Sequence, residues 1–208
     1  MVGWRDSGTS SWLRGQLLSI PAAGTTRQAF GGHDLTHQID EQHRLIVDCG
    51  VPRQSAILAQ AVQTIDNARE WLILTCQFFP NGVTAAHLKR AHDRGVHVRL
   101  IFNDPHKLDP VERISNHLVR AREKLRVPPE FFSDQLPVET PFLHAKVIAS
   151  ERELLVGSHN YVRVGVKLGT AEIALHAVDS ALSLAASRTI AQELNLERAE
   201  QFSFLQEQ

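Results

Sequence analysis

Apolar residues recur along most of this chain with two alternating spacings. Short apolar runs have the length and composition of buried strands. Between them lie longer stretches whose apolar residues are three and four positions apart, as in amphipathic helices. We expect strands at 45–47, 71–76, 96–102 and 130–132. We expect helices at 55–69, 83–93 and 109–124, with Asp109 as the N-cap of the last and Gly95 just beyond the second.

The pattern changes after residue 141. Two apolar runs at 142–149 and 154–156 flank a polar turn at 150–153, which predicts a hairpin. A strand at 172–177 and a helix at 181–200 follow. Strands that alternate with helices predict an α/β fold with a mixed, mostly parallel sheet flanked by helices on both faces. The hairpin adds antiparallel strands to that sheet.

Residues 1–44 have weak periodicity and many glycine, serine and threonine residues, so we expect an irregular N-terminal segment there. Residues 45–208 then form a single domain, long enough to bury a core without disulfides or metals. Cys49 and Cys76 lie in or beside apolar runs, which predicts buried free thiols in a reducing compartment. No apolar run approaches the roughly 18 residues of a membrane span. We expect a cytoplasmic protein, with a peripheral position at a membrane surface as the alternative.

The formal net charge of the 208 residues is −1, so no global positive field attracts nucleic acid. Basic residues do gather in the expected helix 109–124 and just beyond it. Because Glu112 and Glu123 interrupt this run, we interpret it as a solvated helix face rather than a phosphate-binding surface. The run consists of Arg113, Arg120, Arg122, Lys124 and Arg126.

The most informative stretch combines His144 and Lys146 with Gly-Ser-His-Asn at 157–160 and with Glu172. Side chains two positions apart on a strand share a face, so His144 and Lys146 should point the same way. Metal-free cleavage of a phosphodiester needs a nucleophile, a proton donor, and positive or hydrogen-bonding groups at the phosphate oxygens. This set of residues suits that chemistry, with no metal and no cofactor.

Each of these residue types fits one task. His144 would attack phosphorus and form a phosphohistidine, while Lys146 would supply a positive charge for the phosphate oxygens. Ser158 and Asn160 would donate hydrogen bonds to the same oxygens. Glu172 would hold the far ring nitrogen of His144 and so fix its tautomer.

The segments 143–150, 154–160 and 169–174 together resemble the HKD motif of the phospholipase D superfamily. The order of the elements before them extends the resemblance to the second half of cardiolipin synthase-like members, over roughly residues 46–200. The resemblance implies a single phospholipase D-like domain. In this superfamily the active site uses two HKD motifs, in which one histidine attacks phosphorus and the other protonates the leaving group.

This chain carries one full copy of the motif, so the resemblance implies a homodimer or a partner half-domain. One-copy members such as the small bacterial endonucleases build the site across a homodimer. Residues 29–36 weakly resemble the Gly-Gly-x-Asn/Asp segment that closes the first motif in two-copy members, but no His-x-Lys precedes them. Residues 1–44 would then be the remnant of a first half.

The chain departs from the family pattern at two positions. Glu151 stands where the family usually has aspartate, which concerns a turn or support role rather than the chemistry. Thr170 replaces the usual asparagine two residues before Glu172 and can still donate a hydrogen bond. Gln77 and Phe78 follow a strand end, where α/β sites often lie, with core packing as the alternative. We assign substrate binding to Ser158, Thr170, Gln77 and Phe78.

The remaining histidines favour plainer roles. For His159, inside the motif, we expect a structural or surface position. Three others lie near the N-terminus without the tight spacing of a metal site, and they predict a solvated loop. These three are His33, His37 and His43.

The resemblance and the residues together favour a phospholipase D-like phosphodiesterase or phosphatidyltransferase that acts on a phospholipid. The apolar pair Phe78 and Phe79 supports a lipid substrate. One alternative is a metal-independent endonuclease of the same superfamily, although the near-neutral charge does not favour a nucleic acid partner. Another alternative is an inactive half-domain that serves as a binding module.

Overall fold

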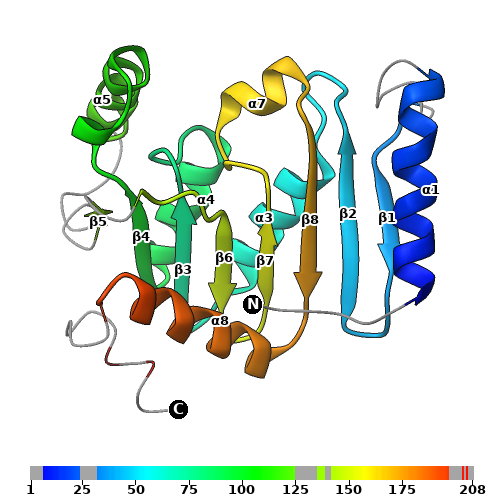
Figure 1. The fold of residues 1–208 in the computed structure, drawn as a ribbon. Coiled ribbons are helices and arrows are strands. Elements are labelled where there is room, and N and C mark those ends of the chain that lie inside the picture. The colour runs from blue at the N-terminus through cyan, green and yellow to red at the C-terminus, as the bar shows by residue number, and fades with distance from the viewer. Residues whose placement is uncertain are drawn as a thin grey trace.

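The computed structural model describes residues 7–23, 32–124, 135–138 and 142–196, together with residues 203 and 205. In these ranges eight strands form one sheet in the order β1-β2-β8-β7-β6-β3-β4-β5 (Figure 1). The strands are β1 (Leu35–Gln38), β2 (His43–Cys49), β3 (Trp71–Cys76), β4 (His97–Asn103), β5 (Gln135–Val138), β6 (Val147–Ser150), β7 (Leu154–Gly157) and β8 (Ala171–Ala177). The helices are α1 (Ser7–Ala23), α3 (Ala56–Asn67), α4 (Val83–Asp93), α5 (Pro110–Lys124), α7 (Arg163–Leu168) and α8 (Ser180–Glu193), with a 3-10 turn η1 (Pro105–Lys107).

The α/β class and the mixed sheet are confirmed, but the expectation of a mostly parallel sheet is wrong. Only β3–β4 and β4–β5 pair in parallel, and the other five neighbouring pairs are antiparallel. Parallel neighbours need a crossover connection, which α4 and α5 supply for these two pairs. Short hairpins join β1 to β2 and β6 to β7, and such connections make neighbouring strands antiparallel.

The N-terminal region differs from the expected irregular segment, because it contains α1 and β1. Residues of β1 pair with β2 in a continuous antiparallel register, from Leu35 opposite Val47 to Gln38 opposite Arg44. The ring of Trp12 on α1 stacks on His37 of β1, with 4.5 Å between the ring centroids. Tertiary contacts therefore order a segment whose local periodicity is weak. The domain division at residue 44 and the origin of 1–44 as a remnant stay predictions.

Most other expected elements are present with shifted ends. The strand at 71–76 and the helix at 83–93 have the expected bounds. The strand expected at 142–149 begins only at Val147, and the helix expected at 181–200 ends at Glu193. The strand expected at 130–132 lies outside the described residues.

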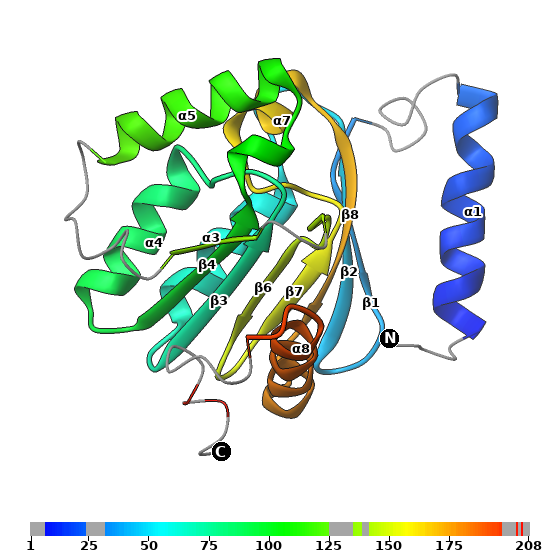
Figure 2. The same ribbon diagram turned by 60° about the vertical axis from the view of Figure 1, so that its left-hand side comes forward.

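Helices cover the two faces of the sheet (Figure 2), and a hydrophobic cluster lies on each face. Alternate residues of β3 point to opposite faces, so Leu72 and Leu74 pack with α3 and α4 while Ile73 packs on the α8 side. All six residues of β3 are buried, as in a strand covered on both faces. The expected free thiols are confirmed, since Cys49 and Cys76 are both buried and unpaired. None of the helices in the described ranges has the length and apolar character that crossing a membrane requires.

A buried polar cluster joins α3 to the sheet at the end opposite the candidate site. Glu153, in the turn between β6 and β7, accepts hydrogen bonds from Thr64 (2.9 Å), Asn67 (2.7 Å) and His176 Nε2 (3.0 Å). Arg44 Nε donates to His176 Nδ1 at 3.2 Å, so His176 presents Nε2 to Glu153 as the donor. Burial acts to raise the pKa of Glu153, but hydrogen bonds from His176, Asn67 and Thr64 lower it to about 2.

Replacing Glu153 with glutamine should reduce the loss of stability in acid. A carboxyl whose pKa falls from 4.5 to about 2 on folding contributes about 3 kcal/mol at neutral pH. This contribution is present above the ordinary pKa of 4.5 and is lost as the pH falls toward 2, with about 2 kcal/mol gone by pH 3. Urea unfolding at neutral pH and at about pH 3 measures the difference.

The control for this experiment is Glu41→Gln, which removes one negative charge from an exposed turn. We expect the control to follow the wild-type pH dependence and Glu153→Gln to have a shallower one. Parallel pH curves for wild type and Glu153→Gln would show that the buried carboxylate does not contribute in this way.

Candidate active site

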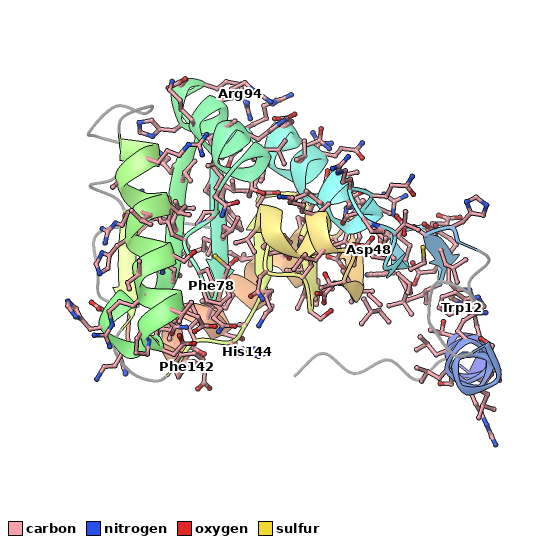
Figure 3. All side chains as sticks on the ribbon, turned by 90° about the horizontal axis from the view of Figure 1, so that it is seen from above. Trp12, Asp48, Phe78, Arg94, Phe142 and His144 are labelled. Carbon is pink, nitrogen blue, oxygen red and sulfur yellow. The ribbon has the colours of Figure 1, made fainter. Side chains whose placement is uncertain are left out.

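The antiparallel order of β6, β7 and β8 brings the candidate residues to one end of the sheet. His144 and Lys146 lie just before β6, Ser158 follows β7, and Glu172 is the second residue of β8. The start of β6, the end of β7 and the start of β8 therefore meet at the end seen in Figure 3. There an open hollow of about 500 Å³ is lined by His144, Lys146, Gly157 and Ser158, together with Leu45, Val156, Ile173, Ala174 and Leu175.

His144 and Lys146 reach this hollow from a segment without regular secondary structure. Residues 142–146 precede β6 rather than forming part of it. The side chain of His144 is exposed, whereas Lys146 is only 4% exposed. The alternation of a strand is therefore not the reason that both residues line the hollow.

Two buried polar side chains hold this segment in place. Asn103, at the end of β4, donates from Nδ2 to the carbonyl of Leu143 (2.8 Å) and accepts at Oδ1 from the Leu143 N–H (2.7 Å). Thr75 on β3 donates to the carbonyl of Ala145 (3.2 Å) and accepts from the Val147 N–H (3.1 Å). We call Thr75 and Asn103 the backbone clamp. It satisfies main-chain groups of Leu143, Ala145 and Val147 and fixes the backbone on both sides of His144.

Lys146 is a buried cation next to the hollow. Its Nζ donates to the carbonyl oxygen of His144 at 2.6 Å. Burial lowers the pKa of the Lys146 ammonium, and the negative charge of Glu172 acts in the opposite direction. A phosphate in the hollow would further stabilise the charged form of this ammonium, so the lysine is suited to bind an anion.

The turn after β7 depends on close contact between β7 and β8. A Cβ atom at Gly157 would lie 2.3 Å from the carbonyl oxygen of Ile173 and 2.7 Å from Cα of Ala174, so only glycine fits. The next residue, Ser158, donates its N–H to the Ile173 carbonyl (2.9 Å), and its Oγ accepts from the Ile173 N–H (3.0 Å). These bonds place the Ser158 hydroxyl at the edge of the hollow.

Tyr161 is an anchor of this turn that sequence reasoning missed. It is fully buried and has a positive φ of 53°, which is unusual for a residue other than glycine. Its N–H donates to His159 Nδ1 (2.9 Å), its hydroxyl donates to the Lys146 carbonyl (3.3 Å), and its carbonyl accepts from Thr84 (2.9 Å). Tyr161 thus connects the turn to the segment that carries His144.

The two remaining motif residues of the turn differ in their surroundings. His159 is buried, and burial lowers its pKa while the charge of Glu172 opposes this. Because Nδ1 accepts from Tyr161, the ring is neutral and carries its proton on Nε2, which agrees with the structural position expected for it. Asn160 is half-buried, and its Oδ1 has no hydrogen-bond partner within the described residues.

Glu172 does not hold His144 as expected from the sequence. Its Oε2 accepts a short hydrogen bond from the Ser158 hydroxyl, and within the described residues no hydrogen bond joins it to the His144 ring. Glu172 lies on the α3 side of β8, since its neighbour in register, Asp48, contacts the start of α3. The orienting role of Glu172 stays a prediction. It would require this carboxylate to release the Ser158 hydroxyl and accept a hydrogen bond from the His144 ring.

Three of the expected substrate-binding residues do not line the hollow. Gln77 is half-buried, and its carbonyl accepts from Asn103 Nδ2 at 3.4 Å. Thr170 is exposed in the turn before β8. Phe78 lines a second cavity of about 240 Å³ beneath α5, together with Phe79 and Asn116.

The remaining positions singled out in the sequence have structural contacts. Glu151 lies at the far end of β6, where its carboxylate accepts from the backbone N–H of Arg69 at 2.9 Å. This placement agrees with a support role for the position where the family usually has aspartate. His43 Nδ1 lies 2.7 Å from Asp40 Oδ1, and His37 stacks on Trp12.

Comparison with known proteins identifies the family. Residues 61–195 match the family described as "Cardiolipin synthase, PLD-like domain". The chain belongs to this family. The family match covers the clamp, the residues of the HKD-like motif and every residue lining the hollow except Leu45.

Solved structures of the phospholipase D superfamily share the fold. Nuc from Salmonella typhimurium, a phospholipase D family member, is similar with a TM-score of 0.56 and 18% identity. NucT from Helicobacter pylori has a TM-score of 0.55 and 18% identity, and each alignment covers 74% of this chain and 96% of the other. Phosphatidylserine synthase from Haemophilus influenzae Rd KW20 has a TM-score of 0.52 and 14% identity, over 78% of this chain and 40% of its own. A search of curated proteins found no match.

The backbone clamp yields a test that separates positioning from stability. Thr75→Val keeps the shape of the side chain but leaves the Val147 N–H without its partner, at a cost of about 1–3 kcal/mol in the free energy of unfolding. A displaced His144 segment should lower phosphodiesterase activity by about 100-fold.

Thr75→Ser is the matched control, because it retains the hydroxyl and should retain most of the activity. Steady-state kinetics on bis(p-nitrophenyl) phosphate, with urea unfolding of the same samples, separates the two effects. Equal activity for the valine and serine variants would rule out a positioning role for the Thr75 hydroxyl.

Proposed function

We propose that this protein is a phospholipase D-type phosphodiesterase or phosphatidyltransferase that acts on a phospholipid through a phosphohistidine. The observation that carries the proposal is the hollow in which the exposed ring of His144 lies beside the buried ammonium of Lys146 and the hydroxyl of Ser158. Family membership supports phosphodiester chemistry, and the apolar wall of the hollow supports a lipid substrate.

The proposed reaction has two steps. A ring nitrogen of His144 attacks phosphorus, the ester P–O bond breaks, and the leaving oxygen takes a proton from a second histidine. Water or an alcohol then gives its proton back to that histidine and attacks phosphorus, which breaks the P–N bond and restores His144. Lys146 stabilises the non-bridging oxygens throughout, and Ser158 joins it when its hydroxyl proton turns from Glu172 to the phosphate.

A second copy of this chain is the proposed source of the other histidine. The hollow lies on the α8 face of the sheet, where apolar residues of β2, β7 and β8 are only partly covered. Ile173, at 39% exposure, is the most exposed of them. A second copy packed on this face would bury the apolar residues and bring its His144 toward the first.

A metal-independent endonuclease of the same superfamily is the second candidate. The observation that favours it is the near-complete coverage of Nuc and NucT, since each alignment spans 96% of the other chain. Against it stands the apolar lining of the hollow by Leu45, Val156, Ile173 and Leu175, since a nucleic-acid channel gains its affinity from basic side chains.

Replacing His144 with alanine tests the proposed nucleophile. Because His144 is exposed, the variant should fold like the wild type and lose at least about 1,000-fold in turnover of bis(p-nitrophenyl) phosphate. All assays contain EDTA, so a metal-dependent contaminant does not contribute. Turnover retained by His144→Ala would refute the assignment.

The same assay with phospholipid vesicles and with plasmid DNA decides between the two candidates. If headgroup release from the vesicles depends on His144 and the plasmid DNA stays intact, the result supports a phospholipid substrate. If the plasmid is nicked and the lipid stays intact, the result supports the endonuclease instead of the phospholipid-acting enzyme.

Mixed dimers test whether two copies share one site. Wild type and His144→Ala are unfolded, combined in equal amounts and refolded together. If each site needs His144 from both copies, only dimers with two wild-type chains work, and activity falls to about one quarter of the undiluted value. A fall to only one half would mean that each copy works alone and would contradict the shared site.

A further inference from the structure

Helix α5 departs from the usual polarity of a surface helix, although its Val119 packs against the core. Its inward face carries Arg113, Asn116 and Arg120, of which Asn116 is buried and the two arginines are half-buried. The Arg120 guanidinium lies over the Phe102 ring, 5.5 Å from its centroid. The solvated basic face expected from the sequence is therefore wrong for these two arginines.

The outward face of α5 carries three exposed apolar residues among exposed polar ones. Val111, Ile114 and Leu118 are 78%, 62% and 67% exposed. Their spacing of three and four positions places them along one stripe of the helix. Single exposed apolar residues are common, but a contiguous stripe marks a surface that contacts an apolar partner.

The stripe belongs to the end of the molecule that carries His144. Helix α5 follows β4 at the end of the sheet where β6 begins, and Figure 3 shows α5 beside Phe78, Phe142 and His144. Phe142 (52% exposed) and Leu168 at the end of α7 (69% exposed) add to the apolar surface of the same end. Exposed apolar residues thus lie at the same end of the sheet as His144.

Cations border these apolar residues. Lys107, Arg122 and Lys167 are exposed at this end. The carboxylate of Asp109 accepts from the N–H groups of Val111 (2.9 Å) and Glu112 (3.0 Å), so its charge is used in capping α5. An apolar stripe bordered by lysine and arginine is typical of a helix that lies in the interface of a bilayer with anionic lipids. A nucleic-acid surface would need basic side chains where the stripe is apolar.

We infer that the His144 end of this protein docks on an anionic phospholipid bilayer, with α5 lying along the surface and its Val111–Ile114–Leu118 stripe in the interface. The inference rests on the proposed phospholipid substrate, and it explains how a diester reaches His144 without leaving the bilayer. Val111 also lines the 240 Å³ cavity with Phe78 and Phe79, so an apolar space opens beside the inserted stripe.

Vesicle binding tests the docking surface without any need for catalysis. The full chain is sedimented with sucrose-loaded vesicles of equal parts phosphatidylcholine and phosphatidylglycerol. Ile114→Glu/Leu118→Glu places two charges on the stripe and should weaken vesicle partitioning by about tenfold or more. The matched control is Leu17→Glu/Leu18→Glu on α1, where two leucines are equally exposed (63% and 65%) but far from His144, and its partitioning should stay within about twofold.

Two further measurements separate a loss of membrane binding from damage to the site or to the fold. Hydrolysis of bis(p-nitrophenyl) phosphate by Ile114→Glu/Leu118→Glu should match the wild type, because neither residue lines the hollow. Should the double variant fail to fold, Ile114→Trp replaces it, and its fluorescence should shift to the blue when vesicles are added.

The inference is overturned if the wild type does not sediment with vesicles, or if the α1 control loses as much binding as the α5 variant. It is also overturned if the α5 substitutions change the oligomeric state in the absence of lipid, or abolish binding to plasmid DNA instead. An unshifted Ile114→Trp spectrum contradicts it equally. If the protein still hydrolyses the soluble diester in any of these cases, the phosphodiesterase proposal stands. A failure of membrane docking is therefore distinguishable from a failure of the proposed function.

Discussion

The site depends on the hydrogen bonds by which Thr75 and Asn103 hold the backbone on both sides of His144. Without the clamp, the buried main-chain groups of Leu143 and the N–H of Val147 would lose these hydrogen bonds. The clamp residues belong to the two parallel strands β3 and β4, while the motif belongs to the antiparallel strands β6 to β8. The parallel half of the sheet therefore supports the chemistry of the antiparallel half.

Local patterns predicted the elements better than their arrangement. The apolar run 71–76 and the amphipathic stretch 83–93 have the bounds that were expected, because burial and periodicity act within those segments. The direction of neighbouring strands depends on which strands come together, and β8 lies between β2 and β7, far from both β3 and β4 in the sheet. The order of α1 and β1 likewise depends on contacts such as Trp12 with His37, which no local pattern shows.

The motif predicted which residues gather, but not how they are held. His144, Lys146 and Ser158 do line one hollow. Thr75 and Asn103 could have been noticed as polar residues in or ending apolar strands, where a buried hydroxyl or amide must have a partner. Nothing in the spacing of residues 144–172 indicates that Glu172 contacts Ser158 rather than His144. That choice depends on which face of β8 the carboxylate occupies.

Tyr161 gives the site a property that the motif does not suggest. Its ring is part of the main hydrophobic core, and its backbone and hydroxyl bind His159, Thr84 and Lys146. The turn that carries Ser158 and Asn160 is therefore continuous with the core instead of being a separate surface loop. Opening this turn requires the removal of a core aromatic residue, at a free energy close to that of unfolding the whole domain. The turn and the core should consequently exchange their amide protons as one cooperative unit, and a ligand of the hollow must fit a surface that does not adapt to it.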